Sequence, residues 1–369
     1  MSTTTRTEVA VDELEVGAYT IPTDQPEADG TLAWDSTTLV LVHAHGGGEV
    51  GLGYTYADVS TAKLIDSKLT RIVGGCDALS PQAAWERMVE QTRNLGRPGI
   101  TSMAIAAVDT ALWDLKARVL GVPLCKLLGM AHERVPVYGS GGFTAYSDER
   151  LAAQLAEWVE QGIPRVKMKV GSEPDRDPER VKVARTAIGP NARLFVDANG
   201  AYTRKQALDL AGRFAEDARV SWFEEPVSSE DLEGLRLLRD RAPAGMEIAA
   251  GEYGDDAPYF RRMIEAGAVD VLQADVTRCG GITELLRVGA LCRAHNLPLS
   301  LHCGPAIHLH PATAIEQFIH LEYFHDHVRI EHMLFDGVID PRDGDLVPAL
   351  DRPGNGLELK RADAERHAA

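Results

Sequence analysis

Cysteine is scarce in this 369-residue chain, and no two cysteines form a CxxC motif. The five that occur are scattered along the sequence: Cys76, Cys125, Cys279, Cys292 and Cys303. Their odd number and spacing favour reduced thiols in a cytoplasmic protein over a disulfide framework. Cys303 directly follows His302, so it is the first cysteine to test for a catalytic role.

Long apolar runs and an excess of basic residues are also missing. No stretch approaches the ~20 apolar residues that span a bilayer. The early segment MSTTTRTEVAVDELEVG lacks the basic start and apolar run of a secretion signal. Acidic residues outnumber basic ones by 55 to 38, which gives a net charge of −17 and argues against general affinity for nucleic acid or anionic membranes.

The first 130 residues differ in pattern from the rest. TTLVLVHAH and GEVGLGYTY indicate strands joined across Gly46, Gly47 and Gly48, and helical stretches follow. Residues 22–36, PTDQPEADGTLAWDS, have the composition of a long loop, and such loops in compact domains are often lids. We therefore predict an α+β domain over residues 1–130, against which the polar tail 342–369 packs.

From residue 131 to 341, short apolar runs alternate with amphipathic segments such as DERLAAQLAEWVEQG. Eight runs qualify as strands: VPVYGS, RVKMKV, RLFVDA, VSWFEE, EIAAGE, VDVLQAD, LPLSLH and FIHLEY. Eight strands at this spacing predict an α/β fold of the (β/α) barrel type, in which the last unit need not be complete. All strand C-termini then open on one face, where catalytic groups gather.

Three acidic residues end consecutive predicted strands. Asp197, Glu224 and Glu252 are spaced by 27 and 28 residues (224 − 197; 252 − 224). Their carboxylates would repel one another unless a cation lay between them, and hard oxygen ligands suit Mg²⁺ or Mn²⁺ better than zinc. Glu225 follows Glu224 and should face the opposite way or lie behind the ligands, so we do not count it as one.

Two lysines come earlier, on the strand RVKMKV. Lys167 and Lys169 are two residues apart, so both ammonium groups should point into the barrel mouth. Two like charges at close range should lower at least one pKa, which would make a lysine available as a general base.

Asp275 and His302 end the next two strands after the acidic set, 27 residues apart (302 − 275). A carboxylate on an imidazole nitrogen fixes the tautomer and raises the basicity of the ring. This pair predicts a second acid/base across the mouth from the lysines. Glu322, on the eighth strand, could hydrogen-bond a developing oxyanion if it were protonated.

Two other patterns are weighed against simpler explanations. Gly46, Gly48 and Gly51 satisfy G-x-G-x-x-G, but the residues that follow are β-like and offer no helix N-terminus to a pyrophosphate. A hairpin turn explains them better. The histidine pairs have no cysteine partners, and we expect them to be structural or exposed: His43/His45, His308/His310 and His325/His327.

Taken in order, VKMKV, VDAN, FEEP, AGE, QADVTRCGG and SLHC resemble the enolase superfamily, specifically the mandelate racemase subgroup. The resemblance covers the whole chain and implies a (β/α)7β barrel with an N-terminal α+β capping domain. It implies Mg²⁺ on the three acidic residues, Lys169 with Lys167 as one acid/base, His302 with Asp275 as the other, and Glu322 as an electrophilic acid. The resemblance extends less securely to two substrate-binding positions: Asn199 and Ser140. It also leads us to expect a small carboxylate substrate and a homo-oligomer.

The resemblance implies removal of the proton next to a carboxylate to give an enediolate. Protonation of a leaving β-hydroxyl by His302 would dehydrate an acid sugar to a 2-keto-3-deoxy acid. We favour this outcome because the capping loops are polar, with four acids able to bind hydroxyls: Asp24, Glu27, Asp29 and Asp35. Racemisation, epimerisation and lactone cycloisomerisation are alternatives, and an inactive metal-binding barrel is the alternative of a different class.

Overall fold

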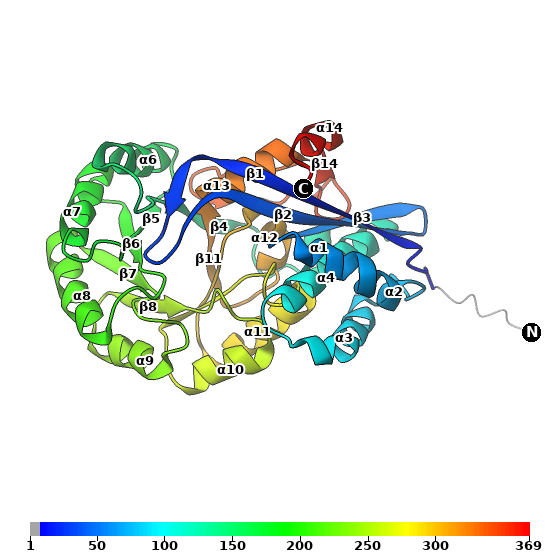
Figure 1. Ribbon diagram of the computed structural model, residues 1–369, viewed down its shortest axis with the longest axis horizontal. Helices are drawn as coiled ribbons and strands as arrows, with labels where there is room; N and C mark the ends of the chain where they lie inside the picture. The colour runs from blue at the N-terminus through cyan, green and yellow to red at the C-terminus, as the bar shows by residue number, and fades with distance from the viewer. Residues whose placement is uncertain (1–7) are drawn as a thin grey trace, which may run out of the picture.

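A computed structural model describes residues 8–369 of the chain. Eight parallel strands pair in chain order, and the last pairs with the first, which closes a barrel (Figure 1). The strands are β4 (Val135–Gly141), β5 (Arg165–Lys169), β6 (Arg193–Asp197), β7 (Val220–Glu224), β8 (Glu247–Ala250), β9 (Val271–Ala274), β10 (Leu299–Leu301) and β11 (Phe318–Phe324). Every strand that the sequence predicts in this region is confirmed.

Helices alternate with these strands and cover the outside of the barrel (Figure 1). They are α6 (Asp148–Glu160), α7 (Asp177–Ile188), α8 (Arg204–Ala218), α9 (Leu232–Arg241), α10 (Ala257–Glu265), α11 (Ile282–His295) and α12 (Pro305–Ala312), with α13 (His325–Leu334) after the last strand. The expected (β/α)7β order is thus confirmed.

The two-residue side-chain period of a strand decides what faces the barrel axis. On β6, Leu194 and Val196 belong to the core under the helices, whereas Phe195 faces inward. Phe195 stacks on Trp222 of β7 at a ring-centroid distance of 5.3 Å. Aromatic rings therefore fill the barrel below its mouth and keep water out of that level.

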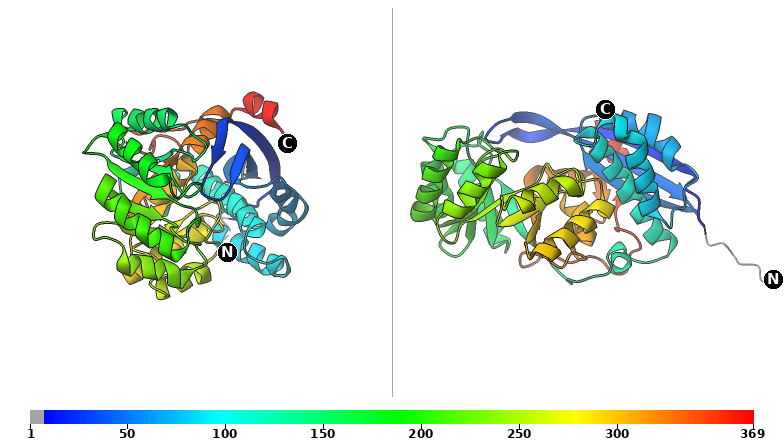
Figure 2. Two further views of the ribbon diagram at one scale, coloured as in Figure 1. Left: turned by 60° about the vertical axis from the view of Figure 1, so that its left-hand side comes forward. Right: turned by 90° about the horizontal axis from the view of Figure 1, so that it is seen from below.

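The N-terminal domain is an antiparallel sheet with helices on one side. Its strands are β1 (Glu13–Ala28), β2 (Ala33–Gly46) and β3 (Glu49–Tyr56), and its helical segments are α1 (Ser60–Leu64), η1 (Ile65–Leu69), α2 (Thr70–Val73), α3 (Pro81–Thr92), η2 (Arg93–Leu95) and α4 (Ile100–Val119), with the short α5 (Leu124–Leu128) before the barrel. The β1–β2 hairpin extends from this domain across the barrel mouth (Figures 1 and 2). The N-terminal domain therefore caps the barrel.

The glycine string is a hairpin, as predicted, and not a nucleotide loop. β2 and β3 are joined at Gly47 and Gly48, both with positive φ. A Cβ added at Gly51 would lie 2.2 Å from the carbonyl oxygen of Ala111 on α4. Glycine is needed there because the helix backbone packs directly on the strand.

The long loop predicted for residues 22–36 is wrong. β1 continues to Ala28 and β2 begins at Ala33, so the true turn is only four residues long. The strand register shifts between Pro22 and Glu27: residues 23–26 bulge out opposite Asp35, and pairing resumes at Glu27. Composition suggested a loop because proline and acidic residues are rare in strands, but this one tolerates them at a bulge.

After α13 comes the C-terminal segment, residues 335–369. It contains β12 (Phe335–Asp336), β13 (Asp345–Leu346), β14 (Glu358–Leu359), α14 (Arg361–Ala364) and η3 (Glu365–His367). It contacts the capping domain at several points: the Asn355 side chain donates to Leu52 O at 3.0 Å, and Arg118 pairs with Glu358 at 2.6 Å. The domain boundaries near residues 130 and 341 remain predictions.

No helix within residues 8–369 has the length and apolar character needed to cross a bilayer. All five cysteines are free and buried.

A buried hydrogen bond joins the capping sheet to the barrel and gives a pH-dependent prediction. Tyr54 on β3 donates to Glu331 of α13 at 2.6 Å, and the Ala306 N–H donates to the other carboxylate oxygen. Burial raises the pKa of Glu331 from 4.5 to about 8, against the opposing effect of these bonds. The folded protein therefore keeps a proton that the unfolded chain loses, and stability should fall as pH rises from about 5 to 8.

Between about pH 5 and 8, the proton retained by Glu331 should make the free energy of unfolding fall by up to about 1.4 kcal/mol for each pH unit of increase. Glu331→Gln should abolish this contribution. Urea unfolding across that pH range measures it, with the exposed Glu233→Gln as control. Parallel pH profiles for wild type and Glu331→Gln would show that Glu331 does not titrate in this window.

Candidate active site

The three predicted metal ligands meet at the barrel mouth. Asp197 and Glu224 are the last residues of β6 and β7, and Glu252 lies two residues beyond β8. All three are buried, and one carboxylate oxygen from each lies within 4.8 Å of the others. The Trp222 indole below them donates to Glu224 Oε2 at 2.9 Å and fixes its orientation.

These carboxylates suit a divalent cation. Glu252 Oε2 is buried and accepts no hydrogen bond from any of residues 8–369. Burial, followed by the charge of Asp197, raises the pKa of Glu224 to about 8, which shows how poorly the cluster tolerates its own negative charge. Three converging oxygens with an unused lone pair match the ligands that Mg²⁺ prefers.

Both predicted lysines face this cluster. Lys167 Nζ contacts Glu224 Oε1 at 2.5 Å and Glu322 Oε1 at 2.8 Å, whereas Lys169 Nζ contacts Asp197 Oδ2 at 2.6 Å. Lys167 is fully buried, but Lys169 lines the open pocket. Only Lys169 is therefore placed to touch a substrate, and Lys167 neutralises the acids beside it.

The expected lowering of a lysine pKa is wrong for this arrangement. Burial disfavours both ammonium groups, but their pKa values are raised above normal because acidic neighbours outweigh it, chiefly Glu224 for Lys167 and Asp197 for Lys169. The prediction counted only the like charge of the second lysine. It did not count carboxylates contributed by other strands.

The predicted Asp–His pair is present. His302 Nδ1 lies 2.9 Å from Asp275 Oδ2, and His302 Nε2 lies 3.5 Å from Glu252 Oε2. Burial opposes protonation of the ring, but Glu252, Glu322 and the bond to Asp275 raise the pKa of His302. The pair thus directs Nε2 toward the carboxylate cluster, and the raised pKa favours the charged form of the ring.

The surroundings of Glu322 disfavour the protonated form that hydrogen-bonding to an oxyanion would require. Burial favours the neutral acid, but Lys167, His302 and Lys169 together lower the pKa of Glu322 well below normal. Ser140 donates to Glu322 Oε1 at 2.5 Å. Ser140 is itself fully buried, so the structure places it behind Glu322, and its substrate contact stays a prediction.

Asn199 lines the pocket and accepts a hydrogen bond from Lys169 at 3.1 Å. Its φ of 45° turns the chain sharply after Asp197. Glu225 is buried behind the three ligands, where burial and then the charge of Glu252 raise its pKa well above normal. This agrees with leaving Glu225 out of the ligand set.

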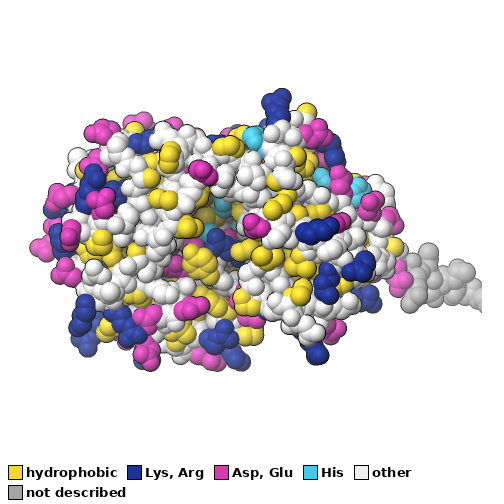
Figure 3. Space-filling view, in the orientation of Figure 1, with side chains coloured by type: hydrophobic (Ala, Val, Ile, Leu, Met, Phe, Trp, Pro, Cys, Tyr) yellow, Lys and Arg dark blue, Asp and Glu magenta, His cyan; other side chains and the backbone are white. Residues whose placement is uncertain are grey.

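Lys169, His302 and Glu252 line a pocket of about 410 Å³ between barrel and cap. Figure 3 shows a hollow in the face between the two, with basic and histidine side chains visible inside it. The capping side of the pocket is lined by Asp29, Leu32, Trp34, Ser36, Thr37, Thr38, Tyr56, Ala57 and Asp58.

Of the four acids expected to bind hydroxyls, only Asp29 lines this pocket. Asp24 contacts His325 at 3.2 Å, and Glu27 is buried and accepts from the Trp34 indole. Asp35 lies outside the pocket lining. The expectation that these acids bind substrate hydroxyls is therefore not met by Asp24, Glu27 or Asp35.

Sequence reasoning also missed Arg278, which lines the pocket and lies 3.3 Å from Glu252 Oε1. Its guanidinium stacks over the Tyr253 ring at 5.1 Å. Arg278 could have been found from the sequence, because it follows the catalytic candidate Asp275 by three residues.

The turn between β1 and β2 depends on a close approach to the site. A Cβ at Gly30 would lie 2.4 Å from Ala198 O and 2.7 Å from Val170 O. These backbone atoms follow Asp197 and Lys169 directly and cannot move without shifting them. Gly30→Ala should therefore lift the turn from the barrel and lower kcat/KM by about 100-fold.

Steady-state kinetics with unfolding curves tests this prediction. The global stability should change little, because the turn is at the surface. Gly212→Ala on α8 is the matched control, since its added Cβ meets nothing within 4 Å. Unchanged kcat/KM in Gly30→Ala would show that the turn does not shape the site.

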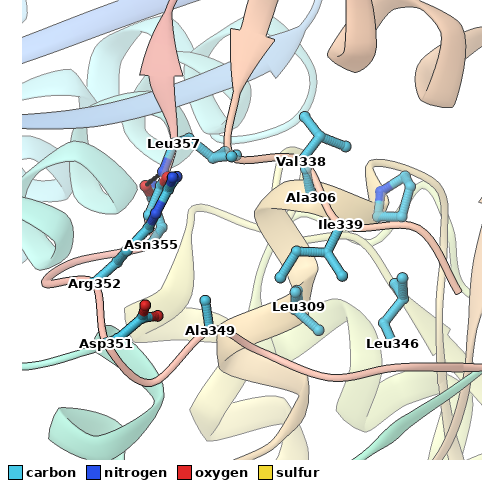
Figure 4. A pocket seen from close by; sticks show the side chains of 13 residues that line it. Ala306, Leu309, Val338, Ile339, Leu346, Ala349, Asp351, Arg352, Asn355 and Leu357 are labelled. Atoms are coloured by element: carbon cyan, nitrogen blue, oxygen red, sulfur yellow. Dashed lines mark hydrogen bonds between the residues drawn. The ribbon is translucent and has the colours of Figure 1, made fainter. Parts of the chain in front are cut away.

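A second cavity, of about 330 Å³, lies between α12 and the C-terminal segment (Figure 4). Its lining is mostly apolar, including Leu309, Ile339 and Leu346, and it contains none of the catalytic candidates.

Comparisons with known proteins agree with this geometry. Residues 150–364 match the enolase C-terminal domain-like family, and residues 20–129 match the N-terminal domain of the mandelate racemase/muconate lactonizing enzyme family. The 3,6-anhydro-alpha-L-galactonate cycloisomerase of Streptomyces coelicolor is 32% identical over 95% of this chain and 97% of its own. The arabinonate dehydratase of Saccharolobus solfataricus is 32% identical over 75% of each chain.

Solved structures give the same answer. A mandelate racemase/muconate lactonizing enzyme-like protein from Rubrobacter xylanophilus is 62% identical over 98% of this chain and 100% of its own, with a TM-score of 0.96. A racemase from S. coelicolor with bound magnesium is 30% identical over 97% of this chain and 100% of its own, with a TM-score of 0.91. The chain therefore belongs to the mandelate racemase/muconate lactonizing enzyme family of the enolase superfamily, a family of metal-dependent enzymes.

Proposed function

We propose that this protein dehydrates a polyhydroxylated monocarboxylic acid, of the sugar-acid class, to a 2-keto-3-deoxy acid. The observation that carries the proposal is the placement of two acid/base groups around one carboxylate cluster. Lys169 lies 2.6 Å from Asp197, and His302 lies 3.5 Å from Glu252. A substrate carboxylate directed to the cluster would place its α-carbon between these groups.

Asp197, Glu224 and Glu252 would hold the Mg²⁺ ion, which when bound neutralises the negative charge that builds on the substrate carboxylate. The remaining steps belong to the side chains. Lys169 removes the α-proton, and protonated His302 delivers its proton to the departing β-hydroxyl. Asp275 holds the ring in the orientation that directs Nε2 into the pocket.

Lys169 must lose its proton before it can act as a base. Its proton is held mainly by Asp197, whose oxygen is 2.6 Å away. When Asp197 serves as a metal ligand, that attraction weakens, whereas the neighbouring charge of Lys167 remains and favours the neutral amine.

The capping side of the pocket, away from the carboxylate cluster, favours a substrate with one carboxylate over a substrate with two. The cationic side chains in the pocket lining, Lys169, Arg278 and the charged form of His302, all lie beside the carboxylate cluster. The capping side instead offers the hydroxyls of residues 36–38 and the acids Asp29 and Asp58. A second carboxylate would meet negative charge there without a cationic partner, whereas sugar hydroxyls would find acceptors.

A panel of sugar monoacids and diacids, assayed with Mg²⁺ in D₂O, tests the proposal. The expected result is a 2-keto product from at least one monoacid, with a higher kcat/KM than its diacid analogue. Absence of both keto product and deuterium exchange with every acid would overturn proton abstraction itself.

Cycloisomerisation or racemisation is the second candidate, since a relative that matches nearly full length is named a cycloisomerase. In the same assay, deuterium incorporation at the α-carbon without keto product would favour racemisation or epimerisation. Conversion of an anhydro acid or a lactone would favour cycloisomerisation.

We also propose a cytoplasmic homo-oligomer. The free, buried thiols support a reducing compartment. Light scattering coupled to size-exclusion chromatography tests the oligomeric state, and a single species at the 40.0 kDa chain mass would overturn it.

A further inference from the structure

Three side chains with different ligand atoms converge next to the acid/base histidine. Cys303 Sγ lies 3.2 Å from His302 Nε2 and 3.4 Å from Glu322 Oε2. His302 Nε2 lies 3.7 Å from the same Glu322 oxygen. All three residues are at least nine-tenths buried, and His302 and Cys303 line the substrate pocket, through which an ion could reach them.

These separations are close to the distances between neighbouring ligand atoms around a tetrahedral zinc ion. Zinc binds thiolate at ~2.3 Å and imidazole or carboxylate at ~2.0 to 2.2 Å, so tetrahedral ligand atoms lie about 3.5 to 3.7 Å from sulfur and about 3.3 to 3.5 Å apart for nitrogen and oxygen. The observed distances of 3.2 and 3.4 Å to sulfur and 3.7 Å between nitrogen and oxygen are close to those values. Shifts of a few tenths of an ångström would complete three of the four positions, and the fourth faces the pocket.

The imidazole and carboxylate ligands are each oriented by a second contact. Asp275 engages His302 Nδ1 at 2.9 Å, which leaves Nε2 for a metal, an arrangement common among zinc histidines. Lys167 and Ser140 hold the other Glu322 oxygen, Oε1, at 2.8 and 2.5 Å. The donor atoms are therefore held in place before an ion arrives.

The ligand chemistry distinguishes this cluster from the three carboxylates beside it. Oxygen-only sites favour Mg²⁺, whereas thiolate with imidazole favours zinc. We propose that His302, Cys303 and Glu322 form a separate inhibitory zinc site. On binding, the Cys303 S–H bond and the His302 Nε2–H bond break, the sulfur and Nε2 form bonds to zinc, and both protons pass to solvent.

Zinc bound there occupies His302 Nε2, so the ring can no longer transfer a proton. Inhibition rests on the proposed role of His302 in catalysis, but zinc binding does not. Binding is therefore measured independently of activity.

Cobalt(II) substitutes for zinc and gives a near-ultraviolet thiolate-to-metal charge-transfer band when bound to sulfur. The titration is made on the full chain with saturating Mg²⁺, which occupies the carboxylate site. We expect one equivalent of cobalt to produce the band in wild type and in Cys76→Ser, whose replaced thiol lies in the capping domain. Cys303→Ser should lose the band and bind zinc at least tenfold more weakly by calorimetry.

Circular dichroism shows whether Cys303→Ser is folded, and Asp275→Asn supplies a second arm. Loss of the carboxylate behind His302 should weaken zinc binding by about 10- to 100-fold while the band remains. Zinc should also inhibit turnover by wild type at lower concentration than by Cys303→Ser. A missing band in wild type, or a band that persists in Cys303→Ser, overturns the site. If no acid is turned over, the proposed function fails, and the optical titration still decides this inference.

Discussion

Lys169→Ala should lower kcat by about 10²- to 10⁴-fold, the usual contribution of a general base. Its ammonium group is the one that reaches the pocket, 2.6 Å from Asp197, whereas Lys167 is enclosed by acids. KM should change much less, because the carboxylate cluster that would anchor the substrate stays intact. Steady-state kinetics on the acid identified by the panel measures both constants.

Deuterium exchange separates this role from a structural one. With Lys169 gone, solvent deuterium should no longer enter at the α-carbon from the lysine side. His302→Asn should instead retain deuterium exchange on the lysine side and lose the departure of the β-hydroxyl. Lys182→Ala on α7 is the control, since this exposed lysine lies outside the pocket and pairs with Glu179 and Asp217. Activity of Lys169→Ala within threefold of wild type would exclude Lys169 as the base.

Asp197→Asn should weaken Mg²⁺ binding by more than about 100-fold. Loss of a residue that only orients a ligand costs about 10- to 100-fold, and Asp197 is proposed to be a ligand itself. Asp197 lies at the centre of the site, where it contacts Lys169 at 2.6 Å and Lys167 at 3.3 Å. Its loss leaves two cations facing fewer acids, which further repels Mg²⁺. Isothermal titration calorimetry measures the affinity.

Thermal unfolding gives a second measurement. At 100 times the dissociation constant, Mg²⁺ should stabilise the wild type by about 2.7 kcal/mol. The same Mg²⁺ concentration should leave the melting temperature of Asp197→Asn nearly unchanged. Glu247→Gln, at the opposite end of β8, controls for loss of one negative charge. Equal Mg²⁺ affinity in Asp197→Asn and wild type would show that the ion binds elsewhere.

The convergence of the candidate metal ligands and acid/base residues was predictable because each lies at or just beyond the end of a short apolar run. Parallel strands bring such positions together whatever the details of packing, as at Asp197, Glu224 and His302. The same rule placed Lys167 and Lys169 on one face. The eight strands were predictable for a related reason, since buried parallel strands are continuous apolar runs.

Residues 22–36 show where local pattern fails. Their composition is that of a loop, yet cross-strand pairing holds Glu27 opposite Trp34 and extends both strands. That pairing depends on a bulge, which has no distinctive sequence. Of the four acids in this segment, only Asp29 therefore lines the pocket.

By itself the sequence determined the order of strands and helices, the direction in which the strand side chains point, and the types of residue at the barrel mouth. These depend on a two-residue period and on chain order, which are local. Only the tertiary structure decided the protonation of the site and the partners of each charge. Lys169, Glu322 and Cys303 owe their state to groups on other strands, and a Coulomb interaction depends on a distance through space that no sequence spacing specifies.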